Sequence, residues 1–402
     1  MDHLGLDLGT TTISAAVLDA DGRLLCTRTV PGGAAVAGQP WERKQDARGI
    51  EHAALSLLDG LLQEFPDIGC VGLTGQMHGI VYVDAAGQLL SPLYTWQDET
   101  GAQPGLGGKS MAARLTERTG YPLASGYGLV TLACHQAAGC IPDGAAAVCT
   151  IADYLAMRLS GRSAPCLTPS MAASLGLFDG TGFDREAVRR AGLPERLLPE
   201  VSEEAELGGG RLRVFAALGD NQASFLGAGH GRLDAPLVNI GTGSQFSFFT
   251  KERLTVPGLE TRPFPGGWLL TGAPLCGGRS FALLERFFRQ TAELVTGTPC
   301  PSASPAMLRA LEAPMPDDVP QFRTTFAGPR QDPAERAVLS GLDEENFAPV
   351  PLLHALLRGM ADELAACYRA ALGAGCAPAG RLLGSGNGLR RNPALQRAVE
   401  RS

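Results

Sequence analysis

Apolar and polar residues alternate along the first part of the chain. Every second residue from 4 to 8 is leucine, and a second alternation runs from 13 to 17 after a Gly-Thr break. A period of two is typical of β-strands, and Asp21-Gly22 marks a further turn. The pattern therefore predicts three strands joined by two tight turns.

A helical pattern follows these strands. Apolar residues recur at helical spacing from Ala54 to Phe65, and Pro66 ends the run. A short apolar run at 70–73 then leads into "TGQMHG", residues 74–79. Strands that alternate with helices predict a layered α/β fold. Residues 353–372 predict a core-packing helix, and residues 298–307 a surface loop of unassigned role.

Composition limits the classes of protein. The chain has 402 residues, 45% of them apolar, which predicts two domains, assigned here to 1–232 and 233–402. The formal net charge is −7 without a basic stripe, so we expect no nucleic-acid partner. No apolar run approaches the roughly 20 residues of a membrane span, and the first residues lack an export signal. We therefore expect no membrane partner and a cytoplasmic location.

Ten cysteines are scattered without a C-x-x-C pair. In a long chain without an export signal, this spacing favours free buried thiols over disulfides.

Two stretches repeat one pattern, a strand that breaks at Gly-Thr and returns as a strand. Residues 237–250 match residues 5–18 in this respect, which predicts two related halves. Glycine lets the backbone turn sharply, and consecutive amides and hydroxyls form a donor nest suited to phosphate. One such turn is often only a hairpin turn, whereas two could grip one polyphosphate from opposite sides. The first phosphate turn comprises Gly9, Thr10, Thr11 and Thr12, and the second phosphate turn comprises Gly241, Thr242, Gly243 and Ser244.

Asp7 ends the strand before the first turn. A carboxylate beside a phosphate nest would repel the ligand unless a cation lay between them, so Asp7 predicts Mg²⁺ held directly or through water. The alternative is an aspartate that caps the turn.

A glycine-rich loop lies near the end of the chain, between a strand at 382–383 and a helix that Asn392-Pro393 opens. Its spacing matches neither a Walker loop nor a dinucleotide fingerprint. Small residues there would let a flat ligand such as adenine lie against the backbone. The loop residues are Gly384, Ser385, Gly386, Asn387 and Gly388.

Asp220 and Asn221 stand where an apolar strand gives way to a helix of small residues. An aspartate there is often an N-cap. Phosphoryl transfer to an alcohol needs alignment, charge neutralisation and one base near the hydroxyl. Asp220, which comes just before the second turn, fits that base.

These motifs, in this order, resemble the FGGY carbohydrate kinases. The resemblance runs from about residue 4 to the end and implies the two-domain actin-like, ribonuclease-H-like ATPase fold, with a cleft between the domains. It implies ATP, Mg²⁺ and a sugar or polyol acceptor. It further assigns phosphate to both turns, catalysis to Asp220, and adenosine to residues 384–387 with Asn392.

A narrower resemblance involves "TGQMHG" and "YTWQDET", residues 94–100, which look like the sugar loops of the sedoheptulokinase and xylulokinase branch. It implies that Gln76 and His78 bond sugar oxygens, that Met77 and Trp96 cover an apolar face, and that Asp98 accepts from hydroxyls. We assign Asn221, next to the base, to the substrate as well.

Gln97, where asparagine is associated with xylulokinases, favours the sedoheptulokinase-like branch, as do residues 126–135 and 322–347. The expected partner is a small-molecule ketose, with sedoheptulose favoured and xylulose left open. A homodimer is left open too.

Two features depart from the family pattern. Glu99 and Thr100 replace the usual Gly-Arg after the Trp-x-Asp motif, which places a contact of that arginine in doubt. The sequence also ends at Ser402, about one strand and one helix short of the family's length, and loss of that layer would expose apolar surface and weaken ATP binding.

Two other classes of function fit these motifs less well. An actin-fold nucleotide-binding protein without sugar kinase activity would keep both turns and the adenosine loop, but it has no use for Gln76, His78, Trp96 and Asp98 together. A metalloenzyme is disfavoured because the six histidines lack metal-ligand spacing.

Overall fold

The computed structural model describes residues 1–105, 107–204, 206–274, 277–326 and 335–402. It divides into two compact units, Met1–Ala223 and Ser224–Ser402. The division falls inside helix α7 (Asp220–Ala228), nine residues before the boundary expected from the sequence at residue 232. Each unit is described by itself.

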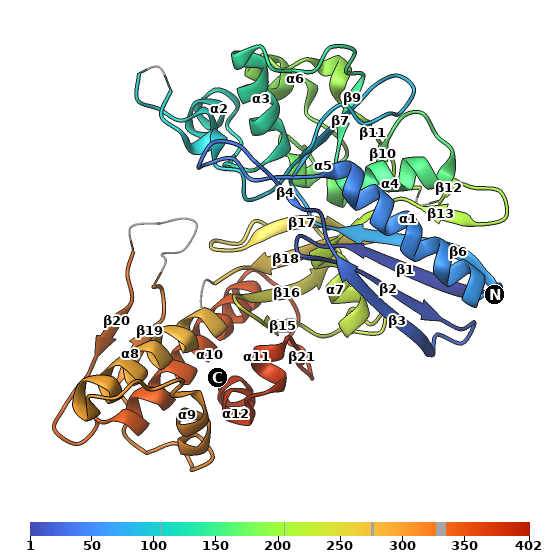
Figure 1. The fold of residues 1–402 in the computed structure, drawn as a ribbon. Coiled ribbons are helices and arrows are strands. Elements are labelled where there is room, and N and C mark those ends of the chain that lie inside the picture. Colours follow the sequence, from blue (N-terminus) through green and yellow to red (C-terminus); the bar gives the residue numbers. More distant parts are fainter. Residues whose placement is uncertain (106, 205, 275–276, 327–334) are drawn as a thin grey trace. The chain divides into compact units, whose positions relative to one another are not determined.

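The first unit is built on one mixed sheet (Figure 1). The strand order is β12-β13-β6-β1-β2-β3, and β14 also pairs with β6. β1 is antiparallel to β2 and parallel to β6, while β13 and β14 both run parallel to β6. The strands are β1 (Asp2–Leu8), β2 (Thr12–Leu18), β3 (Leu24–Pro31), β6 (Ile68–Gly75), β12 (Glu206–Gly208), β13 (Arg213–Phe215) and β14 (Leu218–Gly219). The three strands expected near the N-terminus are confirmed.

Alternation explains why β1 lies in this sheet, since Leu4, Leu6 and Leu8 are all at most 2% exposed. α1 begins after Asp46, whose carboxylate accepts from the Arg48 N–H, and ends before Pro66. The helices of this unit are α1 (Ala47–Glu64), α2 (Met111–Thr119), α3 (Gly128–Ala138), α4 (Ile151–Ser160), α5 (Pro169–Leu175) and α6 (Arg185–Ala191). α1 packs on β1, β2 and β3, and α4 packs on β1, β6 and β13.

Short strands and single turns complete the first unit. β5 lies between β4 and β8 in a small sheet, β7 pairs with β9, and β10 pairs with β11. Their bounds are β4 (Ala35–Val36), β5 (Lys44–Gln45), β7 (Val81–Val83), β8 (Leu93–Tyr94), β9 (Ala147–Cys149), β10 (Cys166–Leu167) and β11 (Glu200–Val201), with 3₁₀ turns at Thr100–Ala102 and Glu195–Leu197.

The second unit contains a five-stranded sheet of order β17-β18-β16-β15-β21. β15 is antiparallel to β16 and parallel to β21, as β1 is to β2 and β6. This shared arrangement agrees with the expectation of two related halves. The strands are β15 (Leu237–Ile240), β16 (Ser244–Thr250), β17 (Glu260–Phe264), β18 (Gly267–Gly272) and β21 (Leu383–Ser385), with a separate pair β19 (Gln321–Arg323) and β20 (Val338–Ser340).

Helices cover this second sheet. The expected core helix is confirmed as α10, whose Leu353, Leu356 and Leu364 are at most 2% exposed. Two loop predictions need correction, because Ser304-Pro305 starts a helix inside the expected loop 298–307 and a short helix starts at Asn387 inside the expected loop 384–388. The helices are α8 (Gly278–Thr296), α9 (Ser304–Ala310), α10 (Pro349–Gly373), α11 (Asn387–Arg390) and α12 (Pro393–Arg401).

Nine cysteines are free in the described part of the chain, and Cys276 lies outside it. Burial was expected for the thiols as a group, but only Cys26, Cys149 and Cys166 are buried and Cys140 is exposed. Within the described residues, no helix has the length and apolarity of a bilayer span.

Candidate active site

Three parallel strands of the first unit end at one edge of its sheet. Asp7 on β1 lies opposite Thr74 on β6, and Thr74 lies opposite Leu218 on β14. One residue further, Leu8, Gly75 and Gly219 are in register across the same three strands. The segments that follow these strands therefore start side by side. They are the first phosphate turn, the "QMHG" loop and Asp220.

Asp7 and Asp220 form the charged part of this edge. The Oδ1 atom of Asp7 is shielded from solvent and has no hydrogen-bond partner among the described residues. Burial raises the pKa of Asp7 above its usual value, and the charge of Asp220 raises it further. A buried acceptor next to a second carboxylate is a position that a divalent cation would stabilise.

These residues fit Mg²⁺. Mg²⁺ is commonly held through one or two carboxylates while water and substrate phosphates fill its remaining positions. The described residues contain no cluster of three or more metal-ligating side chains, so they cannot hold a metal by protein side chains alone. Asp7 is the residue that would hold the ion.

Asp220 is the first residue of α7 and is exposed. Its Oδ1 accepts a hydrogen bond from the Asn221 N–H at 2.7 Å. It therefore lies within the first helical turn and does not precede the helix as an N-cap does. Asn221 itself is 5% exposed.

The first phosphate turn is held from its protein side. The Thr10 carbonyl accepts from Gln45 Nε2 at 2.7 Å, and the Thr11 carbonyl accepts from the Gly32 N–H at 2.8 Å. Trp96 Nε1 donates to Thr10 Oγ1 at 3.0 Å. A Cβ at Gly9 would lie 3.0 Å from the Thr12 carbonyl oxygen, so the turn is tight.

His78 is held in an unusual backbone conformation, with φ of 71°. Its N–H donates to Ser174 Oγ at 3.1 Å, and its Nδ1 donates to the Ser174 carbonyl at 2.7 Å. Its ring stacks on Tyr127 with 4.7 Å between centroids. Because a carbonyl only accepts, Nδ1 carries the proton, so in the neutral form of the ring Nε2 would be an acceptor.

Gln76 and Met77 lie deeper than the sugar-contact prediction implies, at 3% and 5% exposed. Gln76 Nε2 donates to Gln45 Oε1 at 3.0 Å, while its own Oε1 is buried and finds no partner in the part of the chain that the structure describes. Met77 packs against Gly219, where a Cβ would lie 2.6 Å from its sulfur. Met77 is thus a core residue under the strand that precedes Asp220. Its cover of an apolar sugar face remains a prediction.

Trp96 and Asp98 differ in solvent exposure. Trp96 is 41% exposed, as a residue that covers a ligand would be, whereas Asp98 is 2% exposed. Both carboxylate oxygens of Asp98 accept from backbone, Oδ2 from the Arg43 N–H and Oδ1 from the Thr100 N–H, each at 3.0 Å. The observed contacts of Asp98 shape the loop, and its contact with a sugar hydroxyl remains a prediction.

Helix α5 contributes residues that the sequence did not single out. Ser174, 4% exposed, holds His78 as described, and Ser170 Oγ accepts from the Gly219 N–H at 3.4 Å. Thr168 Oγ1, just before the helix, donates to the Ala217 carbonyl at 2.8 Å. One short helix thus fixes both the His78 loop and the strand before Asp220. Thr168-Pro169 signals a helix start, but nothing in the sequence indicates the partners.

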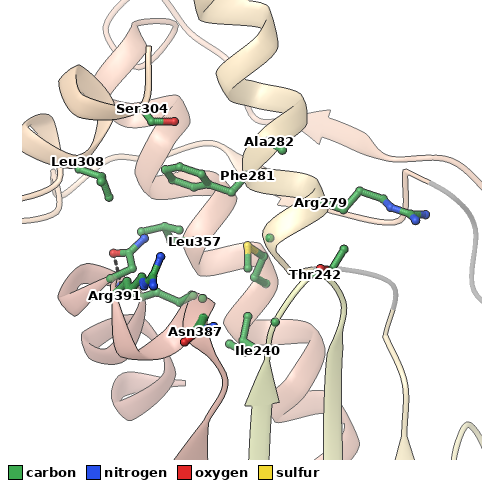
Figure 2. Close-up of a pocket in the computed structure, with 16 residues that line it drawn as sticks. Ile240, Thr242, Arg279, Phe281, Ala282, Ser304, Leu308, Leu357, Asn387 and Arg391 are labelled. Atoms are coloured by element: carbon green, nitrogen blue, oxygen red, sulfur yellow. Dashed lines mark hydrogen bonds between the residues drawn. The ribbon is translucent and has the colours of Figure 1, made fainter. Parts of the chain in front are cut away.

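The second unit contains a cavity of about 830 Å³ (Figure 2). The second phosphate turn supplies Gly241 and Thr242 to its wall, and the predicted adenosine segment supplies Asn387 and Asn392. Figure 2 shows labelled side chains that reach this space from α8, α9, α10 and the region of α11. The structure therefore brings together two motifs that lie about 140 residues apart in the sequence.

Other predicted nucleotide residues are not part of the cavity wall. They are Gly243, Ser244, Gly384, Ser385 and Gly386. Gly386 has φ of 88°, and a Cβ there would lie 2.4 Å from the Ile240 carbonyl oxygen, so this position requires glycine. Asn392 caps α12, since its Oδ1 accepts from the Leu395 N–H at 3.1 Å.

The apolar wall of the cavity was not predicted. Phe281 comes from α8, Leu308 from α9, and Leu357 and Met360 from α10. The α10 residues were assigned to core packing, and both are buried as expected, but they also face the cavity. An apolar wall next to a phosphate turn suits a nucleoside with its phosphates.

Comparison with solved structures identifies the fold. Xylulose kinase from Rhodospirillum rubrum superposes with a TM-score of 0.82 at 21% identity, over 99% of this chain and 84% of that one. The class that the fold defines is thus the actin-like ATPase fold, and the predicted α/β fold class is confirmed.

Sequence comparison gives the family. The model described as "FGGY family of carbohydrate kinases, N-terminal domain" matches residues 3–234. Sedoheptulokinase from Mus musculus is 28% identical over 99% of this chain and 92% of its own length. Xylulose kinase from Streptomyces rubiginosus is 28% identical over 66% of this chain and 58% of its own. The chain belongs to the FGGY family of carbohydrate kinases and is an ATP-dependent sugar kinase.

Proposed function

We propose that the chain transfers the γ-phosphate of ATP to the terminal hydroxyl of a ketose, with sedoheptulose as the substrate. The observation that carries the proposal is the register of β1, β6 and β14, which starts the first phosphate turn, the His78 loop and Asp220 at one edge. A phosphate site, a hydroxyl-binding loop and a carboxylate base are the parts that transfer to an alcohol requires.

Asp220 takes the role of general base. It is exposed at the start of α7, and it accepts the proton as a substrate hydroxyl attacks in line. Asp7 holds Mg²⁺, which when bound offsets the negative charge of the phosphates. The amides of the first phosphate turn stabilise charge on the transferred group.

The acceptor is held on the first unit. His78 Nε2 accepts from a sugar hydroxyl because the Ser174 carbonyl fixes the proton on Nδ1. Trp96 covers an apolar face of the sugar with its exposed ring. Asn221 follows Asp220, and Gln76 lies two residues before His78, and we assign both to further sugar contacts.

The nucleotide lies in the cavity of the second unit. Adenine packs on the wall formed by Phe281 and Leu357, near residues 384–387, and its phosphates extend toward Gly241 and Thr242. Asn392 supports this site by fixing the start of α12.

The choice of sugar rests on the relatives. The proteins named sedoheptulokinase, from mouse and human, align with 99% of this chain and 92% of their own length. Those named xylulose kinase align with 66 to 90% of this chain. This difference in extent favours sedoheptulose, and xylulose is the second candidate.

A substrate panel tests the proposal. ATP turnover with sedoheptulose, xylulose, ribulose and glycerol should be highest with sedoheptulose, and both sedoheptulose and ATP should raise the melting temperature. Faster turnover with xylulose would make xylulose, and not sedoheptulose, the substrate. Stabilisation by ATP with no response to any of the four acceptors would favour a nucleotide-binding protein that lacks sugar kinase activity.

A further inference from the structure

Gln45 on β5 contacts two of the segments proposed to bind ligands. Its Nε2 donates to the Thr10 carbonyl at 2.7 Å and to the Gly33 carbonyl at 3.2 Å. Its Oε1 accepts from Gln76 Nε2 at 3.0 Å. One side-chain amide thus joins the first phosphate turn to the loop that contains His78.

The bond to Thr10 determines the direction of a peptide group. In a planar trans peptide the C=O and N–H point in opposite directions. Because the Thr10 carbonyl is turned toward Gln45, the Thr11 N–H of the same peptide points away from Gln45. The Gly32 N–H holds the Thr11 carbonyl in the same manner and so directs the Thr12 N–H. Carbonyl oxygens, which would repel phosphate, are kept on the protein side of the turn.

The second phosphate turn is oriented by backbone instead. Its Gly241 and Thr242 carbonyls accept from the Gly278 and Arg279 N–H groups at the start of α8, each at 2.9 Å. Thr242 matches Thr10 in the repeated pattern. The Thr10 carbonyl of the first turn is therefore held by a side chain, that of Gln45, whereas the matching Thr242 carbonyl is held by the main chain of α8.

Gln76 links this orientation to the sugar loop. Its N–H donates to the Leu8 carbonyl at 3.0 Å, and its side chain is 3% exposed and bonded to Gln45. Gln76 therefore joins the start of the sugar loop to Gln45, and Gln45 in turn holds the peptide between Thr10 and Thr11.

We propose that Gln45 is a positioning residue that aims the amides of the first phosphate turn at the γ-phosphate and couples this aim to occupancy of the sugar loop. The inference rests on the proposed function. Sugar and ATP then raise each other's affinity, because each ligand stabilises the same arrangement of Gln76, Gln45 and Thr10.

Calorimetric binding of AMP-PNP and of AMP with Mg²⁺, with and without sedoheptulose, tests this. Gln45→Met keeps the length of the side chain and removes its hydrogen bonds. It should weaken AMP-PNP about tenfold, the effect of roughly one lost hydrogen bond, leave AMP within about twofold, and abolish the gain from sedoheptulose. Gln136→Met is the matched control, since Gln136 Nε2 also donates to a carbonyl, that of Gly192 at 2.8 Å, on a different part of the unit.

Two results would overturn the inference. One is a Gln45→Met protein that binds AMP-PNP as the control does and keeps the sedoheptulose gain. The other is a wild type in which sedoheptulose leaves AMP-PNP affinity unchanged. If Gln45→Met does not fold, Gln45→Glu keeps the acceptor for Gln76 and removes the donor to Thr10, and it should weaken AMP-PNP but not AMP. A wild type that turns over no ketose would refute the proposed function, while the contrast between AMP-PNP and AMP would still test the turn.

Discussion

Replacing Ser174 with alanine tests how the sugar loop is held. Ser174 Oγ accepts from the His78 N–H at 3.1 Å and donates to the Met171 carbonyl at 2.7 Å. Removal of the hydroxyl leaves the N–H of a residue at positive φ without this acceptor. Since Ser174 is 4% exposed, water does not readily take the place of the hydroxyl.

The magnitude follows from these contacts. A net hydrogen bond contributes about 0.5–1.5 kcal/mol, and a left-handed backbone costs a non-glycine residue roughly 1–2 kcal/mol. Without Ser174 Oγ, the backbone of His78 relaxes toward an ordinary conformation and must be reordered when sugar binds. A loss of about 1–2 kcal/mol in sugar binding corresponds to roughly a 5- to 30-fold rise in KM for the ketose.

Initial rates with ketose varied at saturating ATP, and with ATP varied at saturating ketose, measure the effect. We expect the KM for ketose to rise and the KM for ATP to stay within about twofold. Ser160→Ala is the matched control, because Ser160 Oγ also donates to carbonyls within its helix, those of Ala156 and Met157. Equal ketose KM values for Ser174→Ala and Ser160→Ala would refute the role given to Ser174.

Three further predictions concern the sugar loop, the cavity and the core. His78→Ala should raise the KM for ketose about tenfold or more while the KM for ATP changes little, which steady-state kinetics would show. Phe281→Ala should lower the affinity for AMP about tenfold in calorimetry, because it removes an aromatic face of the cavity. Unchanged affinity would show that adenine does not bind against Phe281. Burial raises the pKa of Asp153 from 3.8 to about 7. Between these values the folded state binds more protons than the unfolded state, so this group makes the free energy of unfolding fall as pH rises through that window. Urea unfolding at pH 4 to 8 should show a smaller decline for Asp153→Asn, and parallel curves would contradict this.

The sequence could predict what depends on local patterns. Alternation located β1, and the repeated Gly-Thr break located both phosphate turns. The matching sheet orders of the two units agree with the repeat that the turns suggested. These features depend on neighbouring residues, whose periodicity is visible in the sequence.

What depends on tertiary contacts was not predictable. Asp98 has the chemistry of a hydroxyl acceptor, but the fold buries it against the Arg43 and Thr100 amides. Ser174 and Gln45 have no local signal for these contacts. His78 lies 96 residues from Ser174, and Thr10 lies 35 residues from Gln45. The register that brings Asp7 to Thr74 and Leu218 is likewise set by long-range strand pairing.

The central claim is that Asp220 is the base of a ketose kinase, and ketose-dependent ADP release by the wild type and Asp220→Asn tests it most directly. With sedoheptulose and MgATP, Asp220→Asn should turn over roughly 10²- to 10⁴-fold more slowly while it binds sedoheptulose and unfolds as the wild type does. Full ketose-dependent turnover by Asp220→Asn would contradict the claim.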